Sequence, residues 1–570
     1  MAEYPPSTNS GEWIFALMSS LSVAGTTREG IPILLLKEGT SQTKGKDAIK
    51  NNVEAAKIVA AMLKSVLGPR GMDKMLVSGT GDVTITNDGA TILKEMDVQH
   101  PAAKMMVEIA KAVDDEVGDG TTSSVIIAGA LLEKAEDLIK QGIHPTVIVD
   151  GYRKAMRQAI EILNKIAEDV NIDDHSVLAN IAKTSMESKI VSVDSDVLAD
   201  LAVRAIFSVA EKPTTAEKSG NNHQYLVVDL DNVKVQKKPG GAMHDSTLVE
   251  GIIIDKEVAH SEMPKRIHDA KILLLNSSLE IEKTEFDAKI SIDRPEQMTM
   301  FLEEESKMVR GMTEKIVSVG ANVVFCQKGI DDIAIEYLVK AGISAVKRVK
   351  ESDLNALAKA TGARVVTNLD DLSPRDLGYA QNIEERKVET DKWVFVEKCK
   401  NPKAVSILIR GGSQRVVDEA ERSMHDALMV VKDVVQKPAI VAGGGSPEAY
   451  VSQKLRAWAS GVPGREHYAI LAFADAIESI PVTLAENGGM DVIDTLTGIR
   501  SMQASTNNPW IGVDVKELKV ADMRKRNIVE PLVVKEQILK SATETTAMLL
   551  RIDDILAAAS SSGSTGHAGA

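Results

Sequence analysis

The spacing of apolar residues changes twice along this chain, and the change restricts the folds that the chain can adopt. Near both ends the apolar residues recur every three or four positions, a period that places them on one face of a helix. In the middle they gather instead in short runs, which are typical of buried strands. The helical stripes run through 53–67, 125–139 and 417–435.

The middle of the chain alternates between short apolar runs and helical segments, an order that predicts an α/β unit with a parallel sheet. A long helix is expected over 296–316, after a polar stretch near 280–295, and its apolar face is interrupted at Glu305. The simplest interpretation is that the two helical ends form one domain, into which the α/β part is inserted. The expected strands are 272–275, 323–326, 343–349 and 364–367, and the helices between them are 331–341 and 352–360.

Composition limits the class of protein. The two cysteines, Cys326 and Cys399, cannot form a disulfide framework or a zinc site with four cysteine ligands, so a reducing, cytoplasmic location is expected. The net charge of −15 argues against general nucleic-acid binding, which requires a basic face. The chain has no run of about 18 apolar residues, so no membrane span is expected.

Both ends of the chain look unlike the rest. The apolar stretch 13–18 precedes the first basic residue, Arg28, so it lacks the basic region of a secretory signal. We therefore interpret residues 1–30 as a flexible N-terminal extension. The segment 559–570 is rich in Ser, Gly and Ala and cannot build a core, so it is expected to be a disordered tail.

The segment 118–123, with the sequence Gly-Asp-Gly-Thr-Thr-Ser, directly precedes an apolar helix. Glycines allow the backbone to approach a bulky anion, and the free N–H groups of a helix N-terminus favour phosphate. Asp119 is a hard oxygen ligand that suits Mg²⁺ beside such a phosphate. On these residues alone, a glycine turn that simply caps the helix remains an alternative to a phosphate site.

Two further aspartates are candidates for chemistry. Asp88 lies in an Asn-Asp-Gly turn, where aspartates usually serve the turn itself. Asp426 lies about 200° around its helix from the apolar stripe, so it faces either solvent or a second domain. A glycine loop, 443–445, precedes Ser446 and Pro447, which predicts a helix start with Ser446 as the N-cap. The chain shows no P-loop, dinucleotide fingerprint or histidine cluster spaced for a metal.

These segments together resemble a known family. The motifs at 67–74, 86–91 and 118–122, followed by 441–445 and 528–531, closely resemble those of the group II chaperonins, most of all the archaeal branch, the thermosome. The resemblance covers about residues 31–558. Several separated motifs agree in the same order, which chance does not explain.

The resemblance implies a multidomain α and α/β fold: a mainly helical equatorial ATPase domain from both chain ends, a small α/β intermediate hinge domain, and an inserted α/β apical domain with a helical protrusion that serves as a lid. Two stacked rings of eight or nine identical or paralogous subunits are implied. The expected ranges are 31–172 and 443–558 (equatorial), 173–242 and 407–442 (intermediate), and 243–406 (apical, with the lid near 278–316).

The resemblance also implies the roles of individual residues toward ATP and Mg²⁺. Asp119 is expected to hold Mg²⁺, while Asp88 and Asp426 orient and activate the attacking water. Lys189 is expected to sense the γ-phosphate, although the glycines that often flank this lysine are absent here. The remaining nucleotide-binding residues are expected to be Leu67, Gly68, Pro69, Gly89, Gly120, Thr121, Thr122, Ser123, Gly444, Gly445, Gly512 and Glu530.

The function implied is that of an ATP-dependent chaperone subunit, which encloses unfolded proteins and uses Mg-ATP binding and hydrolysis. Two alternatives use the same residues differently. A Mg-dependent phosphotransferase for small molecules would use the same phosphate loop, but the inserted part lacks a cofactor fingerprint. A structural ring or filament subunit without hydrolysis is disfavoured by the presence of Asp88, Asp119 and Asp426.

Overall fold

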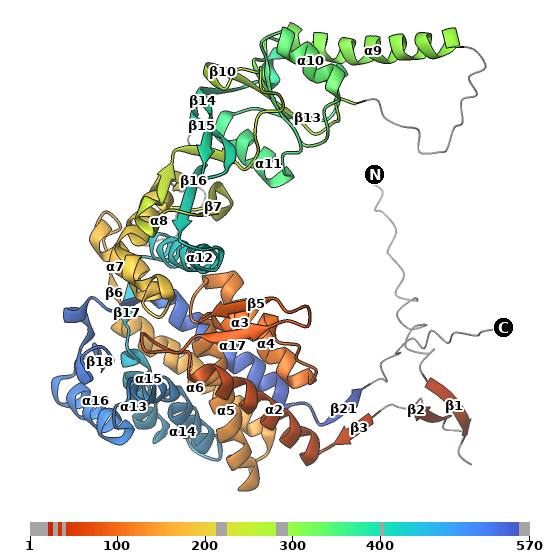
Figure 1. Cartoon of the computed structure of the whole chain (residues 1–570). Helices are drawn as coiled ribbons and strands as arrows, with labels where there is room; N and C mark the ends of the chain where they lie inside the picture. Colours follow the sequence, from red (N-terminus) through yellow and green to blue (C-terminus); the bar gives the residue numbers. More distant parts are fainter. Residues whose placement is uncertain are drawn as a thin grey trace, which may run out of the picture.

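The computed structural model describes residues 21–26, 32–36, 41–212, 225–280, 295–399 and 404–557. The chain forms three successive parts, which we name by their place in Figure 1. The lower part contains residues 41–172 and 439–557, the middle part contains 173–249 and 404–438, and the upper part contains 250–399. The polypeptide thus rises through the middle part, forms the upper part, and returns.

The lower part is a helical bundle to which both ends of the chain contribute. Helix α5 lies at its centre, and Leu131 and Leu132 of that helix are completely buried. The C-terminal helix α17 packs against α5 and α6. The helices are α2 (Lys46–Lys64), α3 (Gly89–Glu95), α4 (Pro101–Val117), α5 (Thr121–Lys140), α6 (Pro145–Ile166), α13 (Ser446–Ala459), α14 (Glu466–Ile477), α15 (Ser479–Gly488), α16 (Val492–Thr506) and α17 (Leu532–Leu550).

Short strands join segments of the lower part that are distant in sequence. The first and last of them pair with each other in antiparallel fashion, which holds the two chain ends together. The pairs and triplets are β3 (Ser41–Lys44) with β21 (Asp554–Ala557), β4 (Lys74–Val77) with β5 (Val83–Thr86), β18 (Ile511–Asp514) with β19 (Lys519–Asp522), and β17 (Ala439–Ala442) between β20 (Val529–Pro531) and β6 (Glu168–Asp169).

The predicted helical stripes are confirmed, with differences at their ends. The stripe over 53–67 is α2, but the helix ends at Lys64, so Leu67 lies in the following loop. The predicted N-cap of α13 is wrong. Gly445, in the left-handed conformation, is the N-cap, because the buried Ser446 side chain donates to the carbonyl of Pro509 instead.

The middle part combines a small sheet with three helices. Strand β16 (Val405–Gly411) lies between β7 (Val233–Pro239), which is parallel to it, and β8 (Thr247–Val249), which is antiparallel. Helices α7 (His175–Met186) and α8 (Ser195–Val209) pack against the long α12 (Gln414–Gln436). The stripe predicted over 417–435 forms the buried face of α12.

The upper part contains a seven-stranded mixed sheet. Strands β10 (Arg266–Leu275), β11 (Val323–Cys326), β12 (Ser344–Val346) and β13 (Val365–Val366) are parallel, as predicted. The sheet is mixed, because three strands that were not predicted extend it in antiparallel fashion: β14 (Gly378–Val388), β15 (Asp391–Cys399) and β9 (Gly251–Ile254). A two-residue turn joins β14 to β15, so this pair needs no crossover helix.

Three helices cover the sheet of the upper part. Helices α9 (Pro295–Ser318) and α10 (Asp332–Lys340) pack on one face, and α11 (Glu351–Thr361) packs on the other. Helix α9 is continuous, and the predicted interruption of its apolar face at Glu305 is confirmed. Glu305 lies on an exposed stretch of α9 that has no core contact to lose, whereas Val309 and Ile316 bury completely further along.

The ranges outside the described residues include most of the predicted extension and tail. Within residues 1–30, only β1 (Leu21–Thr26) is described, and it pairs with β2 (Pro32–Leu36). The tail 559–570 and the first part of the predicted lid segment also lie outside them. Among the described residues, one helical stretch, 466–488, has the length and apolarity of a membrane span; 72% of the apolar 18-residue segment within it is buried inside the protein, as in a core helix.

Candidate functional site

A pocket with two connected chambers lies between the lower and middle parts. The chambers enclose about 880 and 420 Å³, including the solvent at their mouths, and they share lining residues such as Gly68 and Asp119. Every residue predicted for the site lines one chamber or both, except Gly512. The lining residues that were predicted are Leu67, Gly68, Pro69, Asp88, Gly89, Asp119, Gly120, Thr121, Thr122, Ser123, Lys189, Asp426, Gly444, Gly445 and Glu530.

The N-terminus of α5 forms one wall of the smaller chamber. Gly120 is the N-cap in the left-handed conformation, with φ of 82°, and it has no side chain to cap the helix. The N–H of Ser124 bonds to the Gly120 carbonyl at 3.0 Å, so the N–H groups of the preceding turn stay available for a ligand. Opposite, a Cβ at Gly89 would lie 2.5 Å from Thr122 Oγ1, so no side chain fits there. This arrangement fits a phosphate group.

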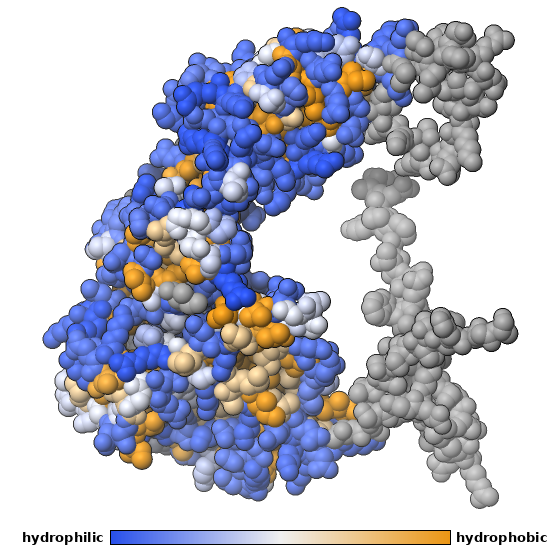
Figure 2. Space-filling view, in the orientation of Figure 1, coloured by the Kyte–Doolittle hydropathy of each residue, from blue (hydrophilic) through white to orange (hydrophobic). Residues whose placement is uncertain are grey.

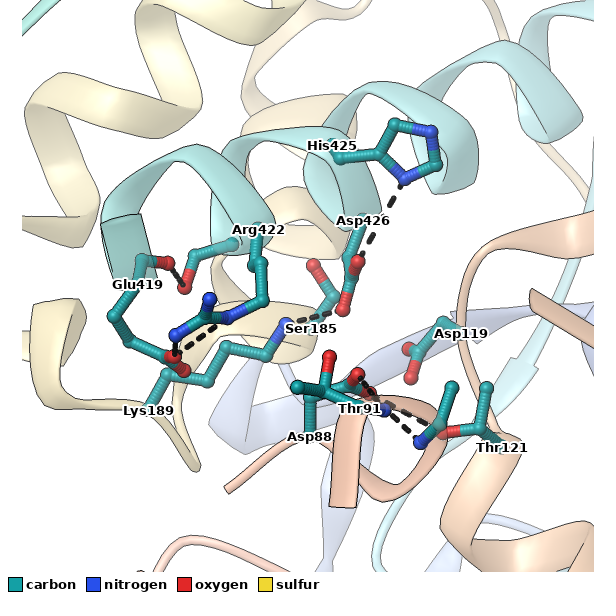
Figure 3. Close-up of polar contacts among 12 residues, drawn as sticks. Asp88, Thr91, Asp119, Thr121, Ser185, Lys189, Glu419, Arg422, His425 and Asp426 are labelled. Carbon is teal, nitrogen blue, oxygen red and sulfur yellow. Dashed lines mark hydrogen bonds and ion pairs between the residues drawn. The ribbon is translucent and has the colours of Figure 1, made fainter. Parts of the chain in front are cut away.

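Asp88 joins this wall to helix α3. Its carboxylate caps α3 by accepting from the N–H of Thr91 at 2.8 Å, and it accepts from Thr121 Oγ1 at 3.5 Å (Figure 3). The turn role that the sequence suggested is therefore real. The same carboxylate also faces the N-terminus of α5, so it is available to a ligand held there.

Asp119 contributes a carboxylate to both chambers. Burial raises its pKa, nearby Asp426 raises it further, and Lys189 opposes this. A half-buried carboxylate of this kind is stabilised in its charged form by a bound cation. Among the described residues, no group of three or more His, Cys, Asp or Glu side chains is arranged to hold a metal ion. A Mg²⁺ ion at Asp119 would therefore take its other ligands from phosphate and water.

Asp426 reaches the smaller chamber from α12 of the middle part (Figure 3). It is only 8% exposed, so of the two environments left open by the sequence, solvent or a second domain, it occupies the second. The ammonium of Lys189 contacts its Oδ2, and His425 Nδ1 lies 3.9 Å from its Oδ1. Burial disfavours the charge on Lys189, but Asp426 and Asp88 outweigh this and raise its pKa.

The larger chamber ends at the glycine loop before α13. Gly444 and Gly445 both have positive φ, and a Cβ at Gly444 would lie 2.8 Å from the carbonyl oxygen of Val513. Gly512 lies behind this loop: a Cβ there would approach the Gly444 carbonyl to 2.9 Å. Gly512 thus allows β18 to approach the loop without lining the pocket itself.

Glu530 of β20 lines the larger chamber within a buried charge cluster. Lys535 Nζ lies 2.7 Å from Glu530 and 2.9 Å from Glu448, and all three groups are largely buried. Burial raises the pKa of Glu530 to about 7, with Lys535 lowering it and Glu448 raising it. The larger chamber therefore combines apolar walls with polar and charged groups, Glu530 among them, which suits a nucleoside.

Sequence reasoning missed several residues that the fold brings to the pocket. Lys535, Ser185, Glu187 and Lys516 line the larger chamber, and they come from three separate elements or loops. Asp114 of α4 lies near Asp88 and Asp426, and burial together with these carboxylates raises its pKa to about 6. None of them belongs to a motif, so only the three-dimensional arrangement identifies them.

Comparison with known proteins agrees with this geometry. Residues 59–560 match the model of the TCP-1/cpn60 chaperonin family. The chain is 54% identical over 530 residues to a thermosome subunit of Methanopyrus kandleri, covering 93% of this chain and 95% of that protein. It is 53% identical over 532 residues to thermosome subunit alpha of Archaeoglobus fulgidus (93% and 96% covered) and 51% identical over 549 residues to thermosome subunit beta of Sulfurisphaera tokodaii (96% and 98% covered).

These relatives confirm the resemblance seen in the sequence motifs. The match extends over both helical ends and the inserted part, so it concerns the whole architecture rather than the phosphate loop alone. The chain belongs to the TCP-1/cpn60 chaperonin family, and it is an ATP-dependent chaperone subunit of the group II type.

Proposed function

We propose that the pocket between the lower and middle parts binds Mg-ATP and hydrolyses it. The observation that carries this proposal is the position of Asp426. This aspartate belongs to the middle part, yet it lines the same chamber as the phosphate-binding turn of the lower part. Hydrolysis then depends on how the two parts are placed, as expected for an ATPase that drives a change of shape.

The α5 turn binds the phosphates in this proposal. The backbone N–H groups and hydroxyls of residues 121–123 donate to phosphate oxygens, and Gly89 leaves room for them. Asp119 would hold Mg²⁺, which would supply positive charge against the negative charge that develops on the phosphates. Lys189 supplies a second positive charge on the side of the γ-phosphate. The loop 67–69, Gly444, Gly445 and Glu530 surround the ribose and base, with Gly512 behind them.

Asp426 and Asp88 position the attacking water, and Asp426 accepts its proton. The water oxygen bonds to the γ-phosphorus while the bond to the β-phosphate oxygen breaks, which yields ADP and phosphate. In the structure, Lys189 occupies one oxygen of the Asp426 carboxylate. In this arrangement the charge of Asp426, the proposed base, is neutralised by Lys189. We therefore expect Lys189 to move before Asp426 accepts a proton.

We propose that the three parts are three domains. We assign 31–172 and 443–558 to an equatorial domain, 173–242 and 407–442 to an intermediate domain, and 243–406 to an apical domain with a lid near 278–316. The small sheet β7-β16-β8 contains strands from both the intermediate and the apical ranges. Subunits, identical or paralogous, form two stacked rings of eight or nine in the cytoplasm, and ATP shifts the rings between open and closed forms.

The upper part offers apolar surface for unfolded proteins. Met308 and Val317 of α9 and Ile333 of α10 are between 38% and 47% exposed. Figure 2 shows apolar side chains gathered on the upper part around these helices. Exposed apolar patches of this kind mark interaction sites. They support the capture of non-native chains, which expose apolar side chains of their own.

The decisive experiment measures Mg-dependent ATP hydrolysis together with particle mass for the wild type and Asp426→Ala. We expect hydrolysis by a particle of about a megadalton, lowered by orders of magnitude in the variant, with ATP still bound. Asp418→Ala is the matched control, because Asp418 lies on the same helix and pairs with Lys237 outside the pocket. Equal rates in wild type and Asp426→Ala would refute the proposal. Hydrolysis by a small particle that depends on a metabolite would favour a phosphotransferase.

A further inference from the structure

A buried carboxylate oxygen on α12 has no hydrogen-bond partner. Glu419 is completely buried, and its Oε2 accepts from Arg422 Nε at 2.9 Å and from Arg422 Nη2 at 2.6 Å. Its Oε1 is buried and accepts no hydrogen bond among the described residues. A buried carboxylate oxygen without a hydrogen-bond partner lowers the stability of the folded protein, so its presence calls for an explanation.

Lys189 lies between Glu419 and Asp426. The two carboxylates are seven residues apart on α12, which is two helical turns, so they project from the same side of the helix. Figure 3 shows the Lys189 side chain passing beside the Glu419 carboxylate and ending at Asp426. Glu419 also contributes to the electrostatic environment that stabilises the charge of Lys189. One buried ammonium therefore has two buried carboxylates within its surroundings.

We propose that Glu419 is a positioning residue, and that its free Oε1 is the alternative acceptor for the Lys189 ammonium. In the structure, Lys189 neutralises Asp426. When Lys189 turns to Glu419, the Asp426 carboxylate is released to accept a proton from water. The inference rests on the proposed function, because it assumes that Asp426 is the base in ATP hydrolysis.

The movement of the Lys189 ammonium from Asp426 to Glu419 does not change the net charge of the buried site. Lys189 is 7% exposed, so it cannot leave Asp426 for water without a large loss of solvation. A second carboxylate on the same helix removes that obstacle, because the ammonium stays paired in both positions. The γ-phosphate can assist by attracting Lys189 away from Asp426, and Glu419 then supplies the remaining acceptor.

The test compares Glu419→Gln, Lys189→Ala, their combination and Arg422→Gln in assembled rings. We expect Glu419→Gln to lower kcat about tenfold, with little change in KM for ATP, since only the step that frees the base is affected. In the Lys189→Ala background, Glu419→Gln has no further effect on the single-turnover rate. Arg422→Gln does not lower kcat, because it leaves the Glu419 carboxylate more available to Lys189.

Other results would overturn the inference. If Glu419 only forms a structural ion pair with Arg422, then Glu419→Gln and Arg422→Gln lower kcat and the melting temperature alike. Equal losses from Glu419→Gln with and without Lys189 would also refute it. The failure of the proposed function is recognised separately: Asp426→Ala then hydrolyses ATP as the wild type does.

Discussion

The two faces of the middle part are built differently. Toward the upper part, Leu408 of β16 packs with Trp393 and Phe395 of β15 in a buried apolar cluster. A buried ion pair lies beside it, since Lys234 Nζ is 2.6 Å from Asp353 of α11. Close-packed side chains leave little freedom for relative movement, so this junction behaves as a fixed joint.

Toward the lower part, the middle part faces a pocket. Lys189 and Asp426 line it from the middle part, while Asp88 and Asp119 line it from the lower part. When a charged ligand enters the pocket, the electrostatic interactions between charges on its two sides change, whereas the contacts of an apolar cluster do not. A ligand can therefore act on the lower junction, and the upper junction transmits the resulting movement to the upper part.

The largest expected effect comes from breaking the upper junction. Lys234→Met leaves Asp353 buried without its partner, and the loss of one member of a buried pair costs about 3 kcal/mol. The side chain of Asp353 is 4% exposed, so water cannot replace the lysine. Chemical denaturation followed by a fluorescence probe in the upper part measures the loss. ATP hydrolysis stays at the wild-type rate, because the pocket lies at the other junction.

The matched control for this variant is Lys234→Met combined with Asp353→Asn. Removing both charges avoids the unpaired carboxylate, so we expect the double variant to recover most of the lost stability. If Lys234→Met were as stable as the wild type, the upper junction would not depend on this pair. A parallel drop in ATP hydrolysis would show that the two junctions are not separable.

The comparison between junctions also shows what the sequence can predict. The glycine turn before α5 was predictable because its residues are consecutive, while its binding of phosphate stays a prediction. The position of Asp426 on its helix marked it as a candidate, and the resemblance to a family then supplied its role together with Lys189 and Glu530. Neither junction was predictable in detail, because Lys234, Asp353 and Phe395 come together only when strands distant in sequence pair.

The antiparallel half of the upper sheet was missed for a related reason. Buried runs such as 272–275 and 323–326 are conspicuous, whereas β14 alternates between buried and exposed residues and carries many charges. Its pairing with β15 depends on a turn at Glu389, which adopts a positive φ of 57° without being glycine or asparagine. Local sequence rules do not anticipate a turn of that kind.

A smaller effect is expected from Asp114 at the lower junction. Burial and the neighbours Asp88 and Asp426 raise its pKa from 3.8 to about 6. The ionised carboxylate therefore destabilises the fold above pH 6, and this penalty disappears as the pH falls through 6 toward 4. Asp114→Asn should be more stable than the wild type at pH 8 by about 1 kcal/mol, less than the full shift implies because Asp114 is partly exposed.

The pH dependence of the difference is the decisive measurement for Asp114. Melting temperatures of Asp114→Asn and wild type, recorded from pH 8 to pH 4, should converge at the acidic end. His425 faces the same region, and hydrogen bonding to Asp426 raises the pKa of His425. Because His425 can therefore add its own pH dependence, the melting temperature of His425→Gln is recorded over the same pH range. A difference between wild type and Asp114→Asn that stays constant with pH would contradict the assignment.

The smallest expected effect concerns the ion pair at the mouth of the pocket. Lys516 Nζ of the lower part lies 2.6 Å from Glu187 of the middle part, and both residues line the larger chamber. Lys516 is well exposed, and exposed ion pairs contribute less than about 1 kcal/mol to the stability of a contact. We therefore expect Lys516→Ala to speed ADP release about two- to threefold. Stopped-flow release of a fluorescent ADP analogue measures this rate.

Two controls separate a contact across the junction from a general loss of positive charge. Lys519→Ala removes a lysine from the same hairpin that pairs with Glu517, within the lower part, so it should leave ADP release unchanged. Exchanging the two charges, with Glu187→Lys and Lys516→Glu, should restore slow release, because the pair forms again in the opposite sense. If the exchanged variant releases ADP as fast as Lys516→Ala, the pair does not hold the pocket closed. In that case no ion pair at the mouth of the pocket fixes the distance between the lower and middle parts. The lower junction then depends on the charges around Asp426 alone, whereas the upper junction is held by packed side chains and a buried ion pair.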